Sequence, residues 1–372
     1  MPILVLLWLR RLEPPVKSGG DGRHIMKNKA WFAVIAGVFF IACAAFVPAG
    51  ERVLHIYTWS DYFDPDVIAA FEDRYDCRVS IDYFDSNEAM YAKIKAGAGG
   101  YDLITPSSYM SAVMRKQDLL VPMDHSLLPN LVNMDRAFTA LTEDPELAYS
   151  VPYTRTVSGV GYNRERLGEV VEKSWGIFAR DDLSRRMTML NDLRETIGAA
   201  LKHLGYSLNT TNEEELEEAG KLLLGWKRNL AKFEVDEAKI GLGSGEFHVI
   251  HGYNGDVALI MEENEGIGFF VPEEGSSLAS DDFVILKGAA NPELSHAFIN
   301  YMLDPEVALR NMEGIFYYMP NPAAVEMLDS GFRDSPAFAL PDAVLAKCEV
   351  IRDLGADNAL YVKIWDMVKA EE

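Results

Sequence analysis

Segments with the patterns of strands and helices alternate along the chain from residue 53 onward. Residues 53–57 have the pattern of a strand, and Asp64 then caps a helix with a proline in its first turn. A second helix is expected over residues 87–96, capped by Ser86, and residues 101–105 have the pattern of a further strand. Such repetition predicts an α/β protein with mainly parallel sheets flanked by helices.

A second series of the same kind begins after residues 149–154, and no low-complexity linker separates the two series. We expect its strands near residues 159–162, 187–190, 247–251, 267–271 and 283–286. Its helices are expected near residues 192–204, 213–230, 292–302 and 304–312. This organisation predicts two lobes joined by crossing strands, with a ligand cleft between them. The expected lobes are residues 51–155 with 283–335, and residues 156–282 with 336–372.

Residues 1–50 are expected to be an N-terminal extension followed by a signal peptide. A short basic stretch follows Met26, and a mostly apolar run over residues 30–47 precedes small residues, which is the order of a secretory signal. Residues 1–25 fit no part of such a signal, so we expect Met26 to be the true start. The alternative is a single membrane anchor, because about 20 apolar residues can span a bilayer.

Cys43 lies near the end of the apolar run, in a Phe-Ile-Ala-Cys sequence that resembles a bacterial lipoprotein processing site. Processing there would make Cys43 a lipidated first residue, whereas cleavage near Ala44 or Ala49 would release a soluble protein. The other two cysteines, Cys77 and Cys348, lie in apolar contexts. An oxidising compartment would permit a disulfide between them, but we expect buried free thiols.

The acidity of the chain is concentrated after residue 50. The whole chain has a net charge of −22, and residues 1–50 contain six basic and two acidic side chains, which leaves −26 on residues 51–372. Such a surface repels nucleic acid and favours cationic ligands. Acidity also serves solubility in many proteins, so charge alone indicates the ligand class only weakly.

Aromatic and acidic side chains recur beside the predicted strands, where ligands bind in open α/β sheets. The loops are Trp59-Ser60-Asp61-Tyr62, Pro106-Ser107-Ser108-Tyr109, Gly252-Tyr253-Asn254-Gly255-Asp256, Asp281 before the strand at 283, and Phe316-Tyr317-Tyr318. A linear alkyl chain with ammonium groups needs such surroundings, namely aromatic walls for its methylenes and carboxylates for its nitrogens.

Each of these features also has a purely structural interpretation. The aromatic residues of the first loop could cover the edge of a sheet, and Asp256 and Asp281 could be ordinary loop acids. Asp192 and Glu195 have the spacing of a capping box, and the helix dipole favours acids at a helix N-terminus. The binding interpretation therefore depends on the recurrence of aromatic and acidic residues at corresponding places.

The sequence contains no recognisable catalytic motif: no Gly-x-Ser-x-Gly, no phosphate-binding Gly-Lys-Ser/Thr loop and no Cys-x-x-Cys pair. His248 and His251 are three residues apart on a predicted strand, a spacing that points them to opposite faces and disfavours a metal site. We therefore expect a binding protein without catalytic residues, metal or cofactor.

Six stretches carry a family resemblance that covers about residues 54–369. They are 57–62 (YTWSDY), 85–88 (DSNE), 101–107 (YDL through PS), 204–211 (LGYSLNTT), 271–275 (VPEEG) and 303–308 (LDPEVA). Together they resemble the spermidine/putrescine-binding periplasmic proteins of bacterial ABC importers. This resemblance implies a two-lobed periplasmic solute-binding protein fold of type II, whose lobes close over the ligand.

The resemblance implies a set of ligand-binding residues: Trp59, Ser60, Asp61, Tyr62, Ser107, Tyr109, Asp192, Glu195, Tyr253, Asp256, Asp281 and Tyr317. Two positions depart from the family pattern. Ala279 stands where a large aromatic residue is typical, and Ile351 stands where some spermidine binders carry Gln. The missing aromatic removes a cation–π contact worth ~0.5–2 kcal/mol, and the preferred polyamine stays open.

The resemblance also implies that the protein is the extracytoplasmic component of an ABC transporter, capturing putrescine or spermidine for membrane permease subunits. We expect a monomer that is periplasmic, or lipid-anchored on the outer face of the cytoplasmic membrane. The alternatives are a same-fold protein for another small solute, a polyamine sensor and an exported enzyme. A solute bearing a carboxylate would need an arginine, and the loops named above contain none.

Overall fold

The computed structural model describes residues 52–140, 142–168, 172–335, 338, 340 and 342–370. The predicted signal peptide, with Met26 and Cys43, lies outside these residues. Within the described ranges, no helix is both long enough and apolar enough to cross a membrane. Cys77 and Cys348 are free thiols, as predicted; Cys77 is buried and Cys348 is half-buried.

The strands are β1 (Val53–Thr58), β2 (Arg78–Tyr83), β3 (Leu103–Ile104), β4 (Ser150–Asn163), β5 (Met187–Met189), β6 (Leu230–Phe233), β7 (Val249–Tyr253), β8 (Ile267–Phe270), β9 (Ser277–Ile285) and β10 (Glu349–Val350). The longer helices are α3 (Pro65–Tyr75), α4 (Asn87–Lys95), α5 (Ser108–Lys116), α8 (Leu193–His203), α9 (Glu213–Lys227), α10 (Asp236–Ser244), α11 (Asn254–Glu263), α12 (Pro292–Met302), α13 (Pro305–Ile315) and α17 (Asn358–Ala370).

Short helical segments complete the described part of the chain. The α-helical ones are α6 (Arg136–Thr139), α7 (Arg164–Leu167), α14 (Pro322–Met327), α15 (Ser330–Arg333) and α16 (Asp342–Leu345). The 3-10 segments are η1 (His125–Leu127), η2 (Pro129–Asn133), η3 (Trp175–Ala179), η4 (Asp181–Leu183) and η5 (Gly355–Asp357).

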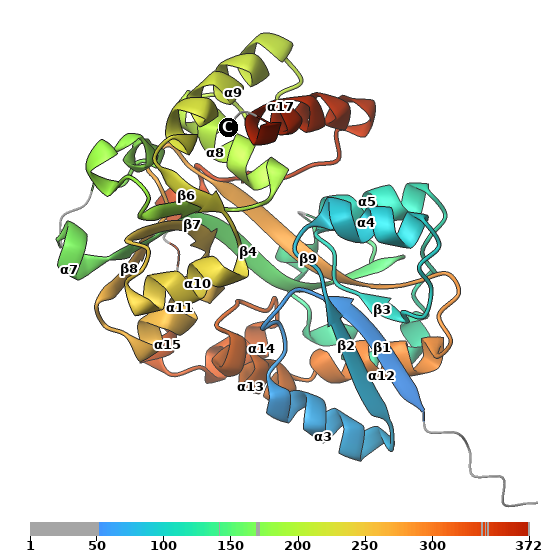
Figure 1. Ribbon diagram of the computed structural model, residues 1–372. Coiled ribbons are helices and arrows are strands. Elements are labelled where there is room, and N and C mark those ends of the chain that lie inside the picture. Colours follow the sequence, from blue (N-terminus) through green and yellow to red (C-terminus); the bar gives the residue numbers. More distant parts are fainter. Residues whose placement is uncertain are drawn as a thin grey trace, which may run out of the picture. The chain divides into compact units, whose positions relative to one another are not determined.

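The strands form one sheet in the order β2-β1-β3-β9-β4-β7-β5-β6, with β10 beside β9 and β8 beside β4. Pairing is parallel at the two ends, within β2-β1-β3 and within β7-β5-β6. In the middle, β9 pairs antiparallel with both β3 and β4, and β4 pairs antiparallel with β7. The predicted α/β architecture is therefore confirmed, while the long strands that connect its two parallel parts run antiparallel (Figure 1).

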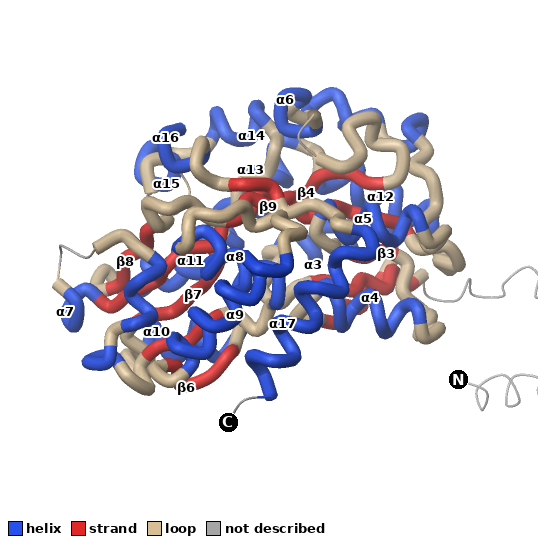
Figure 2. Tube along the Cα trace, turned by 90° about the horizontal axis from the view of Figure 1, so that it is seen from above, coloured by secondary structure: helices blue, strands red, loops and turns tan. Residues whose placement is uncertain are grey.

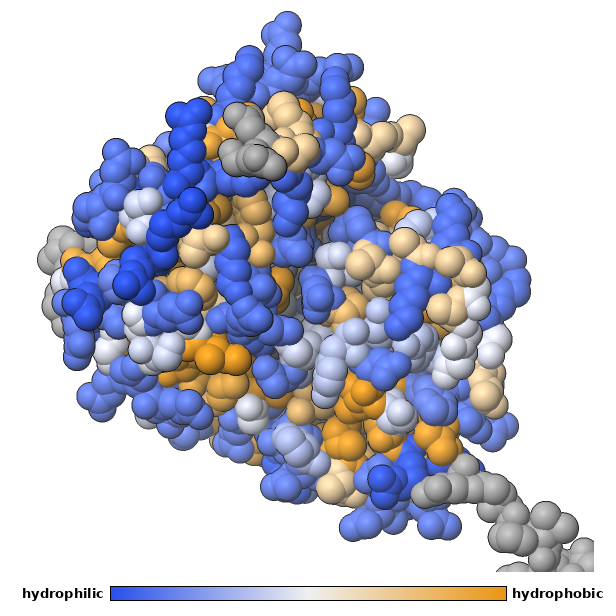
Figure 3. Space-filling view, in the orientation of Figure 1, coloured by the Kyte–Doolittle hydropathy of each residue, from blue (hydrophilic) through white to orange (hydrophobic). Residues whose placement is uncertain are grey.

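Separate hydrophobic cores fill the two parts of the sheet. The core beside β1 is built around stacked aromatic rings such as Phe63, Phe71 and Phe298. The core beside β5 contains Trp175 and Trp226, which are fully buried. Helices α8, α9 and α17 pack against one another over this second core, and helices lie outside the strands in the view of Figure 2. Hydrophilic residues cover most of the face in Figure 3, in keeping with the high net charge.

Helix starts follow the sequence signals closely. Asp64 accepts hydrogen bonds from the backbone of Asp66 and Val67 at 2.9 and 3.0 Å, and thereby caps α3. Ser86 caps α4 by accepting from the backbone of Ala89 at 3.2 Å. Both residues had been expected as caps, because a side-chain oxygen at this position satisfies an otherwise unpaired backbone N–H group.

Strand lengths differ from the sequence-based expectation. Strand β9 begins at Ser277, so Asp281 lies inside a strand and not in the loop before it. Acids are depleted in strands and rarely buried, which is why this segment had the pattern of a loop. The strand continues because each acid finds a donor, as when Ser280 Oγ donates to Asp282 Oδ1 at 2.8 Å. The sequence patterns do not predict strands β6 and β10 or the longer helices α5, α10, α11 and α17.

Gly275→Ala should destabilise the protein by more than about 1 kcal/mol. The backbone of Gly275 has φ +97°, and an added Cβ would meet the Lys347 carbonyl oxygen at 2.0 Å. Gly225 is the matched control, because it lies on the exposed face of α9 with open space around it. Gly225→Ala should stabilise by up to about 1 kcal/mol through helix propensity. Urea unfolding of both variants checks the pair, and equal effects of the two would contradict the close contact at Gly275.

Candidate functional site

A cavity with about 630 Å³ of atom-free space, part of which is open to solvent, lies at the carboxyl ends of β1, β3, β5 and β7 and against the middle of β4 and β9. Its lining residues are Trp59, Ser60, Tyr62, Phe84, Asp85, Asn87, Ser107, Tyr109, Thr156, Asp192, Arg194, Glu195, Val235, Asp236, Tyr253, Asp256, Ala279, Asp281, Tyr317 and Ile351. Segments far apart in the sequence therefore meet at one place.

Eleven of the twelve residues predicted as ligand-binding line this cavity. The exception is Asp61, whose side chain is 65% exposed. Asp61 has a left-handed backbone with φ 52°, and its Oδ2 lies 3.0 Å from Lys239 Nζ. The structure thus turns Asp61 toward a lysine outside the cavity wall, while its neighbours Ser60 and Tyr62 line the cavity.

Aromatic rings form the walls of the cavity. The ring centroids of Tyr62 and Tyr317 lie 5.4 Å apart, and those of Trp59 and Phe84 lie 4.4 Å apart. Trp59 Nε1 donates to the Thr105 carbonyl at 2.9 Å, which fixes the indole beside the end of β1. Such rings offer apolar faces to methylene groups and an attractive quadrupole to cations.

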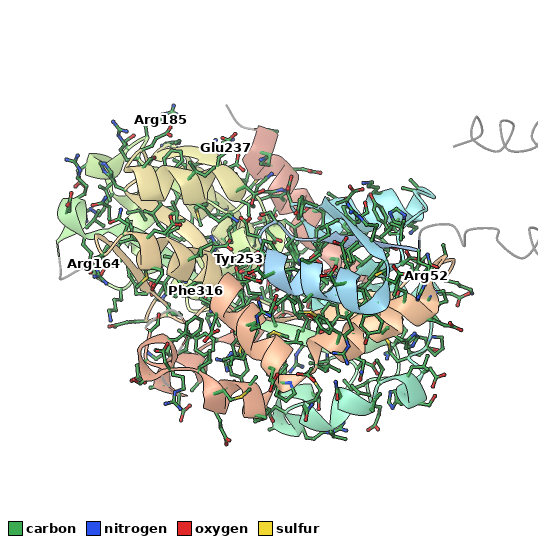
Figure 4. All side chains as sticks on the ribbon, turned by 90° about the horizontal axis from the view of Figure 1, so that it is seen from below. Arg52, Arg164, Arg185, Glu237, Tyr253 and Phe316 are labelled. Atoms are coloured by element: carbon green, nitrogen blue, oxygen red, sulfur yellow. The ribbon has the colours of Figure 1, made fainter. Side chains whose placement is uncertain are left out.

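Tyr253 and Tyr317 belong to the end of β7 and the segment after α13. Tyr253, labelled in Figure 4, ends β7 and is half-buried. Tyr317 O–H donates to Asp256 Oδ1 at 2.9 Å. Its ring lies against the first turn of α11, where an added Cβ on Gly255 would meet it at 2.5 Å. Glycine at this position therefore permits the close approach of the ring.

Asp281 projects into the cavity from the middle of β9. Its Oδ1 accepts from Ser107 Oγ at 2.6 Å, and its Oδ2 accepts from Tyr62 O–H. Burial raises the pKa of Asp281 to about 6, against the opposing effect of these two donors. Asn87 in turn holds Ser107, because its Oδ1 accepts from the Ser107 backbone at 3.1 Å.

Asp192 and Glu195 lie at the start of α8, where Asp192 caps the helix and both side chains line the cavity. Asp192 accepts from the backbone of Arg194 and Glu195 at 2.9 and 3.1 Å, so it is the N-cap. Glu195 Oε2 accepts from Ser277 Oγ at 2.6 Å. Burial, and then the charge of Asp192, raises the pKa of Glu195 to about 7. The structural and the binding interpretations of this pair are therefore compatible.

Sequence reasoning missed several cavity residues. Val235 and Asp236 are not identified from the sequence, because its patterns do not predict α10. Phe84 and Asn87 lie in or beside a stretch that carries the family resemblance, which could have identified them. Thr156 lies inside β4, where an alternating strand pattern gives no signal of its own.

Arg194 brings a basic side chain to the cavity wall that the loops themselves lack. Two nitrogens of its guanidinium group donate to the Arg352 carbonyl and to Asn209 Oδ1, each at 2.9 Å, while Nε is buried without a hydrogen-bond partner in the described part of the chain. The group also lies 4.6 Å from the centre of the Tyr361 ring. These contacts hold the guanidinium group away from an ion pair with a cavity acid, although its charge lowers the pKa of Asp192, which burial raises.

The two positions that depart from the family pattern lie side by side in the wall. Ala279 and Ile351 line both the main cavity and an adjoining one with about 370 Å³ of atom-free space. The adjoining cavity is lined partly by apolar side chains such as Phe138 and Leu278. Ala279 thus borders both spaces at the position where the family pattern has a large aromatic side chain.

Comparison with known proteins places this cavity in a family context. The model for bacterial extracellular solute-binding proteins matches residues 66–339. The putrescine/cadaverine-binding protein of Pseudomonas aeruginosa is 33% identical over 344 residues, covering 88% of this chain and 96% of that protein. The spermidine/putrescine-binding periplasmic protein of Salmonella typhimurium is 30% identical over 347 residues, covering 93% and 99%.

Solved structures are similar over nearly the same range. A putative spermidine/putrescine ABC transporter from Listeria monocytogenes has a TM-score of 0.82 and 34% identity, covering 86% of this chain and 99% of that one. The TpPotD lipoprotein of Treponema pallidum has a TM-score of 0.76 and 34% identity, covering 85% and 99%.

Glu195→Gln should raise the free energy of unfolding of the ligand-free protein by about 1–3 kcal/mol at about pH 8. At this pH the folded protein must hold an ionised Glu195 in the cavity, whereas glutamine is neutral and can still accept from Ser277. The pKa of Glu195 in the folded protein, about 7, lies above its usual 4.5. The stabilising proton is therefore fully bound below about pH 4.5 and is lost as the pH rises through 7.

The gain from this substitution should accordingly shrink toward zero near about pH 4.5. Urea unfolding at the two pH values measures both differences. Glu217→Gln, at an exposed position on α9, is the control and should change the stability little at either pH. Equal stabilities of wild type and Glu195→Gln at the higher pH would refute the raised pKa.

Proposed function

The chain belongs to the family of bacterial extracellular solute-binding proteins, and from this premise we propose that it captures a polyamine for delivery to an ABC importer. Its fold is that of the type II periplasmic solute-binding proteins, as the sequence predicted. The observation that carries the proposal is a group of three buried acids, Asp192, Glu195 and Asp281, which face one cavity.

These three carboxylates need a cation that the protein does not supply. Among the described residues, no side-chain nitrogen of a Lys, Arg or His forms an ion pair within 4.0 Å of any of them. Burying a carboxylate without compensation costs several kcal/mol, on the order of 2–7 for a polar group and more for a charge. Ammonium groups of a ligand would neutralise the acids, and the aromatic walls would contact the methylene chain between them.

The relatives support this ligand class. The relative from Pseudomonas aeruginosa binds putrescine and cadaverine, and the relative from Salmonella typhimurium binds spermidine and putrescine, according to their names. A solute with its own carboxylate fits less well, because three acids of the wall would repel it and two nitrogens of Arg194 already donate to the Arg352 carbonyl and to Asn209. We therefore favour an unbranched polyamine over an acidic solute.

Binding is proposed to proceed by closure of two lobes. We assign residues 51–155 and 283–335 to one lobe, and residues 156–282 and 336–372 to the other. Trp59 and Ser107 would then bind from the first lobe and Glu195 and Tyr253 from the second. A ligand that contacts both sides stabilises the closed state. No bond is made or broken, so we propose a binding protein and not an enzyme.

We further propose that the protein acts as a monomer outside the cytoplasmic membrane and docks to the permease subunits of its importer. The relative from Salmonella typhimurium is periplasmic by name, and a structural neighbour from Treponema pallidum is a lipoprotein. Cys43 decides between the two forms, because only lipidation of this residue would anchor the mature chain.

Calorimetric titration with putrescine, cadaverine, spermidine and spermine tests the proposed function. Unfolding and refolding first removes any bound ligand. Micromolar or tighter binding, about −8 kcal/mol or better, is expected for at least one of the four. No heat with any of them, from a sample whose folding is verified, would overturn the proposal.

Asp281→Asn should weaken the binding of that polyamine by about tenfold or more, because a hydrogen bond to a charged group is worth about 1.5–3 kcal/mol. Asparagine keeps the shape of the side chain and can still accept from Ser107, so the loss reports the charge. Asp66→Asn, at an exposed position in the first turn of α3, should leave the affinity unchanged. Equal affinities of wild type and Asp281→Asn would remove Asp281 from the site.

A further inference from the structure

A lysine ammonium group lies directly behind the wall at one end of the acidic cavity. Lys239 lies on α10, and its side chain is only 13% exposed. Its Nζ lies 3.3 Å from Asp236 Oδ1 and 3.8 Å from Asp256 Oδ1. It also lies 3.0 Å from Asp61 Oδ2 and 3.3 Å from Ser60 Oγ. Asp236, Asp256 and Ser60 are residues of the cavity wall.

The surroundings of Lys239 keep it charged. Burial lowers the pKa of Lys239, but the charges of Asp256, Asp61 and Asp236 outweigh this effect and raise the pKa above its ordinary value. An ammonium group held by several carboxylate oxygens is the arrangement that an amine ligand would itself require. At this end of the cavity, the acids therefore already bind an ammonium group, which is that of the protein's own Lys239.

Five of the six acids in the described cavity wall consequently fall into two groups; the pKa of the sixth, Asp85, is raised by burial and then by the charge of Asp236. Asp236 and Asp256 share the ammonium group of Lys239. Asp192, Glu195 and Asp281 have no such partner among the described residues, as noted above. Asp192, Glu195 and Asp281 need the ammonium group of a ligand. Beside Asp236 and Asp256, a ligand ammonium group would instead meet the positive charge of Lys239.

Because like charges at close range repel, each additional ammonium group of a ligand near Asp256 would have to displace Lys239 or accept its repulsion. We propose that Lys239 substitutes for one ligand ammonium group, so that the protein selects a diamine over a triamine. This inference rests on the proposed function and deepens it, since it names the ligand by its number of charges. Lys239 is thus a specificity-determining residue that need not contact the diamine itself.

Replacing Lys239 should shift the preference toward the longer ligand. Wild type is expected to bind putrescine or cadaverine more tightly than spermidine. In Lys239→Met, which keeps the aliphatic chain and removes the charge, the affinity for spermidine relative to the better diamine should rise about tenfold or more. Calorimetric titration of both ligands at about pH 8, where the acids of the cavity are ionised, measures this ratio.

Three further variants make the result interpretable. Lys239→Gln also removes the charge but can donate to the same carboxylates, so it serves if the methionine variant does not fold. Lys239→Arg keeps the charge and should keep the wild-type ratio. Lys221→Met removes an exposed lysine of α9 and should change neither affinity, which controls for the overall charge of the protein.

The outcomes separate this inference from the proposed function. If wild type binds polyamines but the ratio is the same after Lys239→Met and Lys239→Gln, the role of Lys239 is overturned and the proposed function stands. A parallel loss for diamine and triamine would also overturn it, because Lys239 would then only hold the shape of the cavity. If neither wild type nor any variant binds a polyamine, both proposals fail.

Discussion

The cost of holding carboxylates away from water governs the architecture of this protein. Asp192, Glu195 and Asp281 are almost completely buried, and burial, followed by the charge of Asp192, raises the pKa values of Glu195 and Asp281. Hydrogen bonds from hydroxyl groups offset part of this cost. A cationic ligand can recover the rest of this desolvation cost. The cost that lowers the stability of the ligand-free protein would therefore favour ligand binding.

The fold supplies the donors and the acids from elements that are distant in sequence. Strand β9 carries Asp281 through the middle of the sheet, and the N-terminus of α5 brings Ser107 to it. Helix α8 begins at the cavity, so the backbone N–H groups of its first turn stabilise Asp192. At the opposite end Lys239 supplies a cation directly. Hydrogen bonds, a helix terminus and ion pairs thus all stabilise carboxylates in this one cavity.

Much of this arrangement could be predicted from the sequence. The caps at Asp64 and Ser86 follow local chemistry, and the family resemblance identified most of the cavity wall. The failures have physical causes. Asp281 was placed before its strand because an acid inside a buried strand is unfavourable until its distant donors, such as Tyr62, are known. Asp61 has the same residue type as the cavity acids, but a left-handed turn directs it toward Lys239, and no local pattern predicts this.

If a ligand cation compensates carboxylates whose protons are held by burial, binding of the ligand must release protons. Titration with the bound polyamine at about pH 6.5 in two buffers of different ionisation enthalpy counts the protons released. Release is expected at this pH, because burial raises the pKa values of Asp281 and Glu195 to about 6 and about 7, and almost none is expected at about pH 8.5. Binding whose enthalpy is independent of the buffer at the lower pH, or which takes up protons, would show that the ligand does not compensate these carboxylates.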